Sequence, residues 1–256
     1  MADELAKLPV AQVASFYQRL ADSVDARKGS VKVSLAAMLL RHWLENRDQS
    51  STFEFEPPDH LKSNALTLDG LAYHRRVYLT EEQARITNAG SKWAGVIPRL
   101  QGKPGFQKWN RTLPLVLDYQ SLIEVPLRWQ LTGSDEEKDI LYALHGFQLK
   151  TYVTVQVNSI PNSTNLSIIF MDFTAQAIDR YDWDYSEHLT VPNPDFDSKK
   201  AGAVVPKQDT VVIYHRNAQR LEDARLAAPF NLQTKRWRIT DPKLAGPAVV
   251  DPEKKL

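Results

Sequence analysis

The apolar residues of the first half of the chain recur at intervals of three or four, which is typical of amphipathic helices. One such face follows Pro9 and comprises Val10, Val13, Phe16, Leu20 and Val24. A second follows Ser30, a residue type that caps helix N-termini, and comprises Val33, Leu35, Ala36, Leu39, Leu40, Trp43 and Leu44. We therefore expect two helices, joined by a polar turn at residues 25–30 and followed by an irregular connection at residues 46–51 and 56–59.

Two capping boxes predict further helices. The segments Thr-Glu-Glu-Gln at 80–83 and Ser-Asp-Glu-Glu at 134–137 each place a hydroxyl three residues before a Glu or Gln side chain. We expect a short helix to begin at Thr80, and another to begin at Ser134 and end at Gly146.

After residue 146 the apolar period changes to two, which is typical of half-buried strands. Residues 148–157 and 166–171 predict an antiparallel hairpin around the turn formers at 158–165. Further strands are expected at 113–117, 122–131, 210–215 and 236–240. The pattern predicts the α+β class, with a helical N-terminal region at 1–112 and a β-rich domain at 113–256.

Composition excludes several classes of protein. With 32 Lys and Arg against 31 Asp and Glu, and no basic stripe with interleaved aromatics, nucleic acid is not expected as a partner. The absence of cysteine excludes disulfides, thiolate metal sites and cysteine nucleophiles. The longest apolar runs are far shorter than the roughly 18–20 residues that span a bilayer, so no transmembrane segment is expected. The acidic start of the chain does not match a Sec signal, so a soluble protein is expected.

Phosphate-loop, dinucleotide, zinc-protease and serine-hydrolase motifs do not occur in the sequence. Two of the six histidines, His42 and His145, fall in helical segments where structural roles are favoured. The dense cluster is residues 179–188, with four carboxylates, two tyrosines and a histidine within ten residues. It is interpreted either as a strand end, with Tyr181 and Trp183 in the core and the acids facing water, or as a site that holds a hard cation.

This cluster resembles the DxYDxxxxxHR signature of the colicin M family, bacteriocins that hydrolyse the peptidoglycan precursor lipid II. Asp179, Tyr181, Asp182 and His188 stand at the matching positions. The segment 142–147 and the hairpin after it also resemble the entry to that family's activity domain, and the resemblance covers residues 115–250.

The resemblance implies an open, curved, mainly antiparallel sheet with flanking helices. It also implies a Mg²⁺-dependent phosphodiesterase that cleaves lipid II between undecaprenyl and pyrophosphate. Asp179, Tyr181, Asp182 and His188 would then be the catalytic set. Asp179 and Asp182 would hold the metal, Tyr181 would position a phosphate oxygen, and His188 would activate water or protonate the leaving group.

One position departs from the signature, because Leu189 stands where the family has Arg. We expect Arg180 or Arg216 to bind the substrate phosphate instead, and His215 with Arg216 repeats the His-Arg dipeptide on another expected strand. The family's further acid downstream would correspond to Asp195 or Asp197.

These residues predict an antibacterial toxin, made in the bacterial cytoplasm without a Sec signal and secreted, which acts on lipid II in the periplasm of a target cell. A type VI secretion system fits the delivery, with residues 1–112 docking to a spike or adaptor. A cognate immunity protein is expected by resemblance. The alternative is a non-enzymatic module that binds a protein or a glycan and keeps the fold without the activity.

Overall fold

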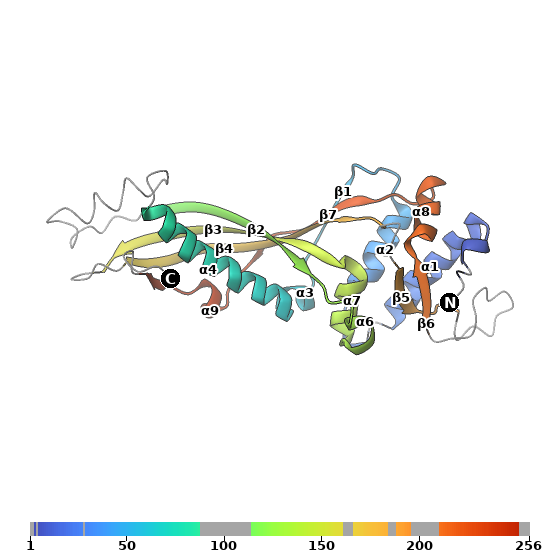
Figure 1. The fold of residues 1–256 in the computed structure, drawn as a ribbon, viewed down its shortest axis with the longest axis horizontal. Helices are drawn as coiled ribbons and strands as arrows, with labels where there is room; N and C mark the ends of the chain where they lie inside the picture. Colours follow the sequence, from blue (N-terminus) through green and yellow to red (C-terminus); the bar gives the residue numbers. More distant parts are fainter. Residues whose placement is uncertain are drawn as a thin grey trace. The chain divides into compact units, whose positions relative to one another are not determined.

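The computed structural model describes residues 3, 5–27, 29–87, 114–160, 166–183, 188–195 and 210–250 (Figure 1). The α+β class is confirmed, with helices and a mainly antiparallel sheet. Contacts divide the chain into two units, each built from three stretches of sequence. Unit 1 comprises Met1–Asn64, Leu122–Phe147 and Ile178–Lys235, and unit 2 comprises Ala65–Ser121, Gln148–Ala177 and Arg236–Leu256. The boundary expected between residues 112 and 113 lies outside the described residues.

The elements follow one another as helices first and strands mainly later. The helices are the short 3₁₀ turn Leu5–Lys7, α1 (Val10–Ala26), α2 (Leu35–Glu45), α3 (Asp59–Ser63), α4 (Ala65–Thr87), α6 (Trp129–Thr132), α7 (Asp135–Leu144), α8 (His215–Asp223) and α9 (Pro242–Ala245). The strands are β1 (Thr52–Phe55), β2 (Pro114–Glu124), β3 (Gly146–Ser159), β4 (Leu166–Tyr181), β5 (His188–Pro192), β6 (Thr210–Tyr214), β7 (Phe230–Thr234), β8 (Trp237–Arg238) and β9 (Ala248–Val250).

Within the described segments, seven strands form one sheet with the order β1-β7-β4-β3-β2, and β8 and β9 pair with β4. Strand β1 runs parallel to β7, whereas β4 is antiparallel to β7, β8 and β9. The expected strands at 148–157 and 166–171 are confirmed as parts of the longer neighbours β3 and β4. Strands β5 and β6 form a separate antiparallel pair.

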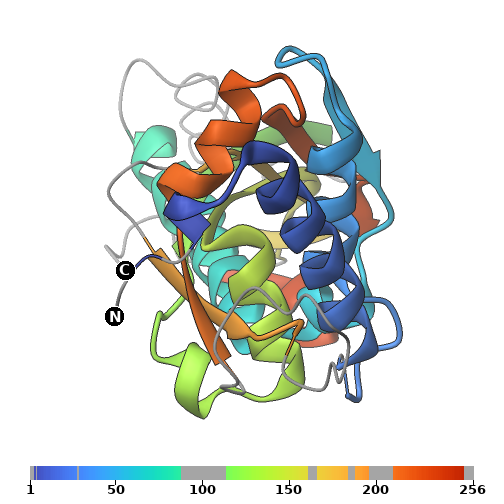
Figure 2. The same ribbon diagram turned by 90° about the vertical axis from the view of Figure 1, so that its right-hand side faces the viewer.

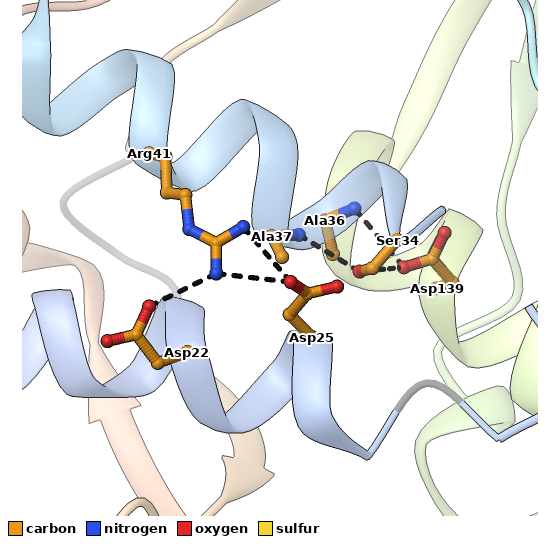
Figure 3. A network of polar contacts seen from close by, with 7 residues as sticks. All are labelled: Asp22, Asp25, Ser34, Ala36, Ala37, Arg41 and Asp139. Carbon is orange, nitrogen blue, oxygen red and sulfur yellow. Dashed lines mark hydrogen bonds and ion pairs between the residues drawn. The ribbon is translucent and has the colours of Figure 1, made fainter. Parts of the chain in front are cut away.

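Helices α1 and α2 lie side by side in unit 1 (Figure 2). Their expected apolar faces are confirmed by buried side chains such as Phe16 and Leu20 of α1 and Trp43 of α2, except at Val33, which precedes α2 and is exposed. At the edge of this contact, Arg41 of α2 donates hydrogen bonds to two carboxylates of α1 (Figure 3). Helix α2 begins after Ser34, so the expectation that Ser30 caps it was wrong.

The reason for this N-terminus is Asp139, a buried carboxylate of α7 that binds the start of α2 (Figure 3). Its Oδ1 accepts hydrogen bonds from Ser34 Oγ at 2.6 Å and from the Ala36 amide at 3.2 Å. Its Oδ2 accepts one from the Leu35 amide at 2.8 Å and lies 2.9 Å from His60 Nε2 on α3. The carboxylate therefore satisfies amides that the first turn of any helix leaves unpaired, and it offsets the helix dipole.

An aromatic cluster forms much of the core of unit 1. The indole of Trp183 lies with its centroid 5.7 Å from the ring of Tyr17 and 5.5 Å from that of Trp43. It also contacts Tyr181 at 6.1 Å and His215 at 4.9 Å. This cluster joins α1, α2 and α8 to the end of β4, so it fixes the position of the strand end that carries the sequence motif.

Unit 2 holds a buried polar cluster beneath α4. His74 is fully buried, its Nδ1 lying 2.8 Å from Thr151 Oγ1 and its Nε2 lying 2.7 Å from Ser121 Oγ. Burial lowers the pKa of His74 to about 4. The neutral imidazole is therefore the form that the fold accommodates.

Three expectations about where helices and strands begin or end were wrong. No helix begins at Thr80, because α4 already begins at Ala65, and its buried stripe includes the polar residues Thr67 and His74, which hide the apolar period. The four-residue strand β1 lies between the two parts of the expected irregular connection, at residues for which no element was expected.

The expected strand at 122–131 ends at Glu124, and helix α6 follows Pro126, which lacks the amide that a ladder needs. The strand expected at 210–215 ends at Tyr214, so His215 and Arg216 belong to helix α8 rather than to a strand. By contrast, the helix predicted at Ser134 is confirmed, with both hydrogen bonds of its capping box present.

Among the described helices, none has both the length and the apolar character that crossing a bilayer requires.

Candidate active site

A pocket of about 260 Å³ opens in unit 1 where three elements end or begin. The end of α7 contributes to it together with the end of β4 and the start of α8. The side chains that bear chemistry are those of Tyr142, His145, Asp179, Tyr181, Asp182 and His215.

Pairing of β4 with β7 positions the motif at this pocket. Asp179 and Tyr181 are two residues apart on β4, opposite Leu232 and Phe230 of β7. Tyr181 stacks on Phe230 with 5.2 Å between ring centroids, and it is buried, as is Trp183 two residues later. The aromatic residues of the motif therefore belong to the core, and they anchor the strand end from which the acids project.

The two acids of the motif differ in environment. Burial, together with the nearby charge of Asp182, raises the pKa of Asp179 to about 7, although a hydrogen bond from the Arg180 backbone opposes this shift. Asp182 is exposed, and its Oδ2 lies 3.4 Å from Nε of Arg180. Arg180 also donates a hydrogen bond from Nη1 to Asn231 Oδ1 at 3.3 Å. The pKa of Asp179 is therefore near neutral pH, whereas Asp182 lies exposed at the rim of the pocket.

The pocket also contains two phenols and lies near a third acid. Burial raises the pKa values of Tyr142 and Tyr181, so both stay protonated and can donate hydrogen bonds at neutral pH. Burial likewise raises the pKa of Glu222, which accepts a hydrogen bond from Trp43 Nε1 at 2.8 Å. The charges of Asp182 and Asp223 add to that shift, whereas the charge of Arg180 opposes it.

Two histidines complete the pocket wall. The rings of His145 and His215 stack with 5.7 Å between centroids and 25° between planes. His145 caps the C-terminus of α7 with φ of 45°, a positive value that residues with a Cβ rarely adopt. Its carbonyl oxygen accepts a hydrogen bond from the Val125 amide at 2.9 Å, which holds the backbone in place.

The structure brings together four of the six predicted site residues. Asp179, Arg180, Tyr181 and Asp182 line the pocket. His188 is absent from the described lining, because its side chain is exposed on β5, where its ring lies 5.8 Å from that of Tyr214. Residues 184–187 lie outside the described residues.

Arg216 is also absent from the described lining of the pocket. Its Nε donates a hydrogen bond to Asp3 Oδ2 at 2.8 Å, and its guanidinium lies over the ring of Tyr214. The further acid considered in the sequence, Asp195, is buried and forms a two-point ion pair with Arg19. The other candidate, Asp197, lies outside the described residues.

Sequence reasoning did not select Tyr142, His145 or His215 as site residues. The signal that could have found them was weak, because they lie more than 25 residues from the motif and meet it only in the folded chain. His145 lies in segment 142–147, which resembles the entry to the colicin M activity domain, and His215 with Arg216 repeats the His-Arg dipeptide of the signature, but neither histidine was assigned a role.

The donor groups of the pocket can be compared with those that hold a divalent cation in proteins. Within the described segments, no group of three His, Cys, Asp or Glu side chains is placed to hold a metal ion. Asp179 and Asp182 are close enough to interact electrostatically. Mg²⁺ is commonly held by one or two carboxylates and completed by water and substrate phosphates. In donor type and number, the two carboxylates therefore match a cation that is shared with a phosphate ligand, and not one enclosed by protein alone.

Comparisons of the chain with protein-family models, with curated proteins and with solved structures find no match in any of the three.

Proposed function

We propose that this chain is an antibacterial phosphodiesterase that hydrolyses lipid II between the undecaprenyl chain and the pyrophosphate. The observation that carries the proposal is the convergence of Asp179 and Asp182 with two histidines and two phenols in one pocket of unit 1. The spacing of the colicin M signature supports this choice of substrate, since the acids of that signature are the acids in the pocket.

The acids suit a pyrophosphate only when a cation accompanies it. Two carboxylates beside a pyrophosphate would place several negative charges in a partly buried space, and the raised pKa of Asp179 already reflects that cost. Asp179 and Asp182 would hold Mg²⁺, and the bound ion supplies neutralisation of the phosphate charge. The phenols of Tyr142 and Tyr181 then donate hydrogen bonds that orient phosphate oxygens.

Arginine has a smaller part in this proposal than the signature implies. Among the described residues that line the pocket, Arg180 is the cationic side chain outside the histidines, and it already pairs with Asp182. A phosphate that reaches the rim can share Arg180 with that carboxylate. Arg216 would have to leave Asp3 before it could take part.

The assay is incubation of the full chain with lipid II and Mg²⁺, followed by chromatographic detection of undecaprenol. The wild type should release it, and Asp179→Asn and Asp182→Asn should each lose about 100-fold or more of the rate. Asp172→Asn is the matched control, because Asp172 is an exposed aspartate on the same strand β4. Absence of release by the wild type, or equal release by Asp179→Asn, would refute the proposal.

The biological setting follows from the same proposal. The protein would be delivered by a type VI secretion system through a spike or adaptor, would act in the periplasm, and would be neutralised by a cognate immunity protein. Expression with an export signal should stop growth, whereas expression in the cytoplasm should not. Toxicity from the cytoplasm, or toxicity that persists in the Asp179→Asn variant, would contradict this site of action.

A second candidate is a non-enzymatic module that binds a protein or a glycan. It is favoured by Leu189, which is 2% exposed and makes part of the pocket wall apolar where the signature has an arginine. Binding of lipid II without any release of undecaprenol, unchanged by Mg²⁺, would support this candidate over the enzyme.

A further inference from the structure

His145 and His215 come from different elements, the end of α7 and the start of α8, yet both line the pocket that holds the acids. Their rings are nearly parallel. His215 is 2% exposed and packs its ring against the edge of Trp183, whereas His145 is partly exposed. Solvent and a ligand can therefore reach the ring of His145, which stacks on the buried ring of His215.

The backbone conformation of His145 also indicates a functional role. His145 is one of two residues other than glycine in the described segments that adopt a positive φ. Its amide donates a hydrogen bond to Leu141 O at 3.2 Å, and the next residue, Gly146, passes so close to β2 that an added Cβ would lie 3.2 Å from Ile123 O. Strained backbone of this kind persists where the surrounding structure imposes it, and it clusters at functional sites.

We propose that His145, rather than His188, is the proton-transfer residue of the pocket, and that His215 is the positioning residue that holds its ring. This inference rests on the proposed phosphodiesterase function. Water attacks phosphorus as the bond from phosphorus to the lipid oxygen breaks, and the electron pair of that bond leaves with the lipid oxygen. His145 accepts the proton of the attacking water and returns it through solvent to the lipid alkoxide, so that one water is consumed.

The pocket allows a sharp pair of variants. Asparagine, like histidine, is enriched among the residues that adopt positive φ, so His145→Asn removes the imidazole with little change of backbone preference. His188→Asn makes the same replacement at the exposed histidine of β5, outside the described lining. We expect His145→Asn to lower kcat about 100-fold or more while KM changes less than about 3-fold, and His188→Asn to stay within about 3-fold of the wild type.

The role of His215 is tested by rescue. His215→Phe keeps an aromatic ring for His145 to stack on, whereas His215→Ala removes it. We expect His215→Phe to retain most of the wild-type kcat and His215→Ala to lose it. Circular dichroism of each variant identifies any that fails to fold, and a folded His215→Ala variant with wild-type kcat would overturn the positioning role.

Failure of the inference and failure of the proposed function give different results. An active wild type whose rate is unchanged in His145→Asn overturns the role of His145 and leaves the function intact. An inactive wild type refutes lipid II hydrolysis itself. In that case the imidazole resonances are followed by NMR during addition of inorganic pyrophosphate with Mg²⁺. Shifts confined to His145 and His215 support the pocket as the phosphate site, and shifts at His188 alone overturn the assignment.

Discussion

The substitution Asp139→Asn tests how unit 1 is held together. The carboxylate accepts three hydrogen bonds at the start of α2 and contacts His60, and its side chain is 4% exposed. Asparagine has nearly the same shape, but it replaces one carboxylate oxygen by an NH₂ group that can only donate. The carboxylate accepts from two backbone amides, one at each oxygen, so either orientation of the asparagine amide leaves one of these amides facing NH₂ and without an acceptor.

The expected cost follows from those contacts. Hydrogen bonds to a charged group contribute about 1.5–3 kcal/mol each, and Asp139→Asn loses one backbone amide contact and removes the charge from the other hydrogen bonds. We therefore expect Asp139→Asn to lower the free energy of unfolding by about 3–5 kcal/mol. The measurement is urea unfolding at pH 7, followed by both tryptophan fluorescence and far-ultraviolet circular dichroism.

Asp22→Asn is the matched control, because it makes the same chemical change in the exposed ion pair with Arg41 (Figure 3). The side chain of Asp22 is 63% exposed, so this substitution should cost less than about 0.5 kcal/mol. If Asp139→Asn destabilises the chain no more than Asp22→Asn does, then the buried carboxylate is not what holds the start of α2.

Three further predictions concern other parts of the chain. The unfolded chain binds a proton at His74 with a pKa of 6.5 and the folded chain only at about 4, so stability should fall by about 2 kcal/mol from pH 7 to pH 5. His74→Gln should remove this part of the pH dependence in urea unfolding, and an unchanged pH profile would contradict it. Asp179→Asn should raise stability at pH 8 by about 1–2 kcal/mol, because it removes a half-buried charge, and the gain should shrink toward pH 5. Destabilisation at pH 8 would show that the charge is well accommodated. Ser134→Ala should cost about 1 kcal/mol in thermal unfolding through loss of the capping box, and no change in Tm would refute it.

Local signals in the sequence predicted those elements that depend on local interactions. The apolar faces of α1 and α2 and the capping box at Ser134 were confirmed, because each is made by residues within a few positions of one another. The start of α2 was predicted wrongly because Asp139, about 100 residues away, supplies the acceptor. Helix α4 was missed because His74 belongs to its buried stripe, and its partners Thr151 and Ser121 are on distant strands.

In the candidate site, too, residues close together in the sequence were predicted and residues brought together by packing were not. The spacing of Asp179, Tyr181 and Asp182 was visible in the sequence, and these residues do line one pocket. The histidines of that pocket come from α7 and α8, and no spacing rule connects His145 or His215 to the motif. Their approach is a product of packing, since Trp183 supports His215 and His215 in turn stacks on His145.

Exposed and buried side chains alternate along β5, and this explains why Leu189 lines the pocket whereas His188 does not. In this strand His188 is exposed and Leu189 is buried, and Leu189 faces Ile213 of β6 and the pocket. Neighbouring residues of a strand point to opposite faces, so one register cannot send both side chains inward. An arginine at 189 would reach the pocket, whereas leucine closes that wall with apolar atoms. A phosphate bound here would therefore depend on a cation held by Asp179 and Asp182. Proton transfer during its hydrolysis would depend on a histidine from outside the motif, and His145 is the histidine that we propose for this step.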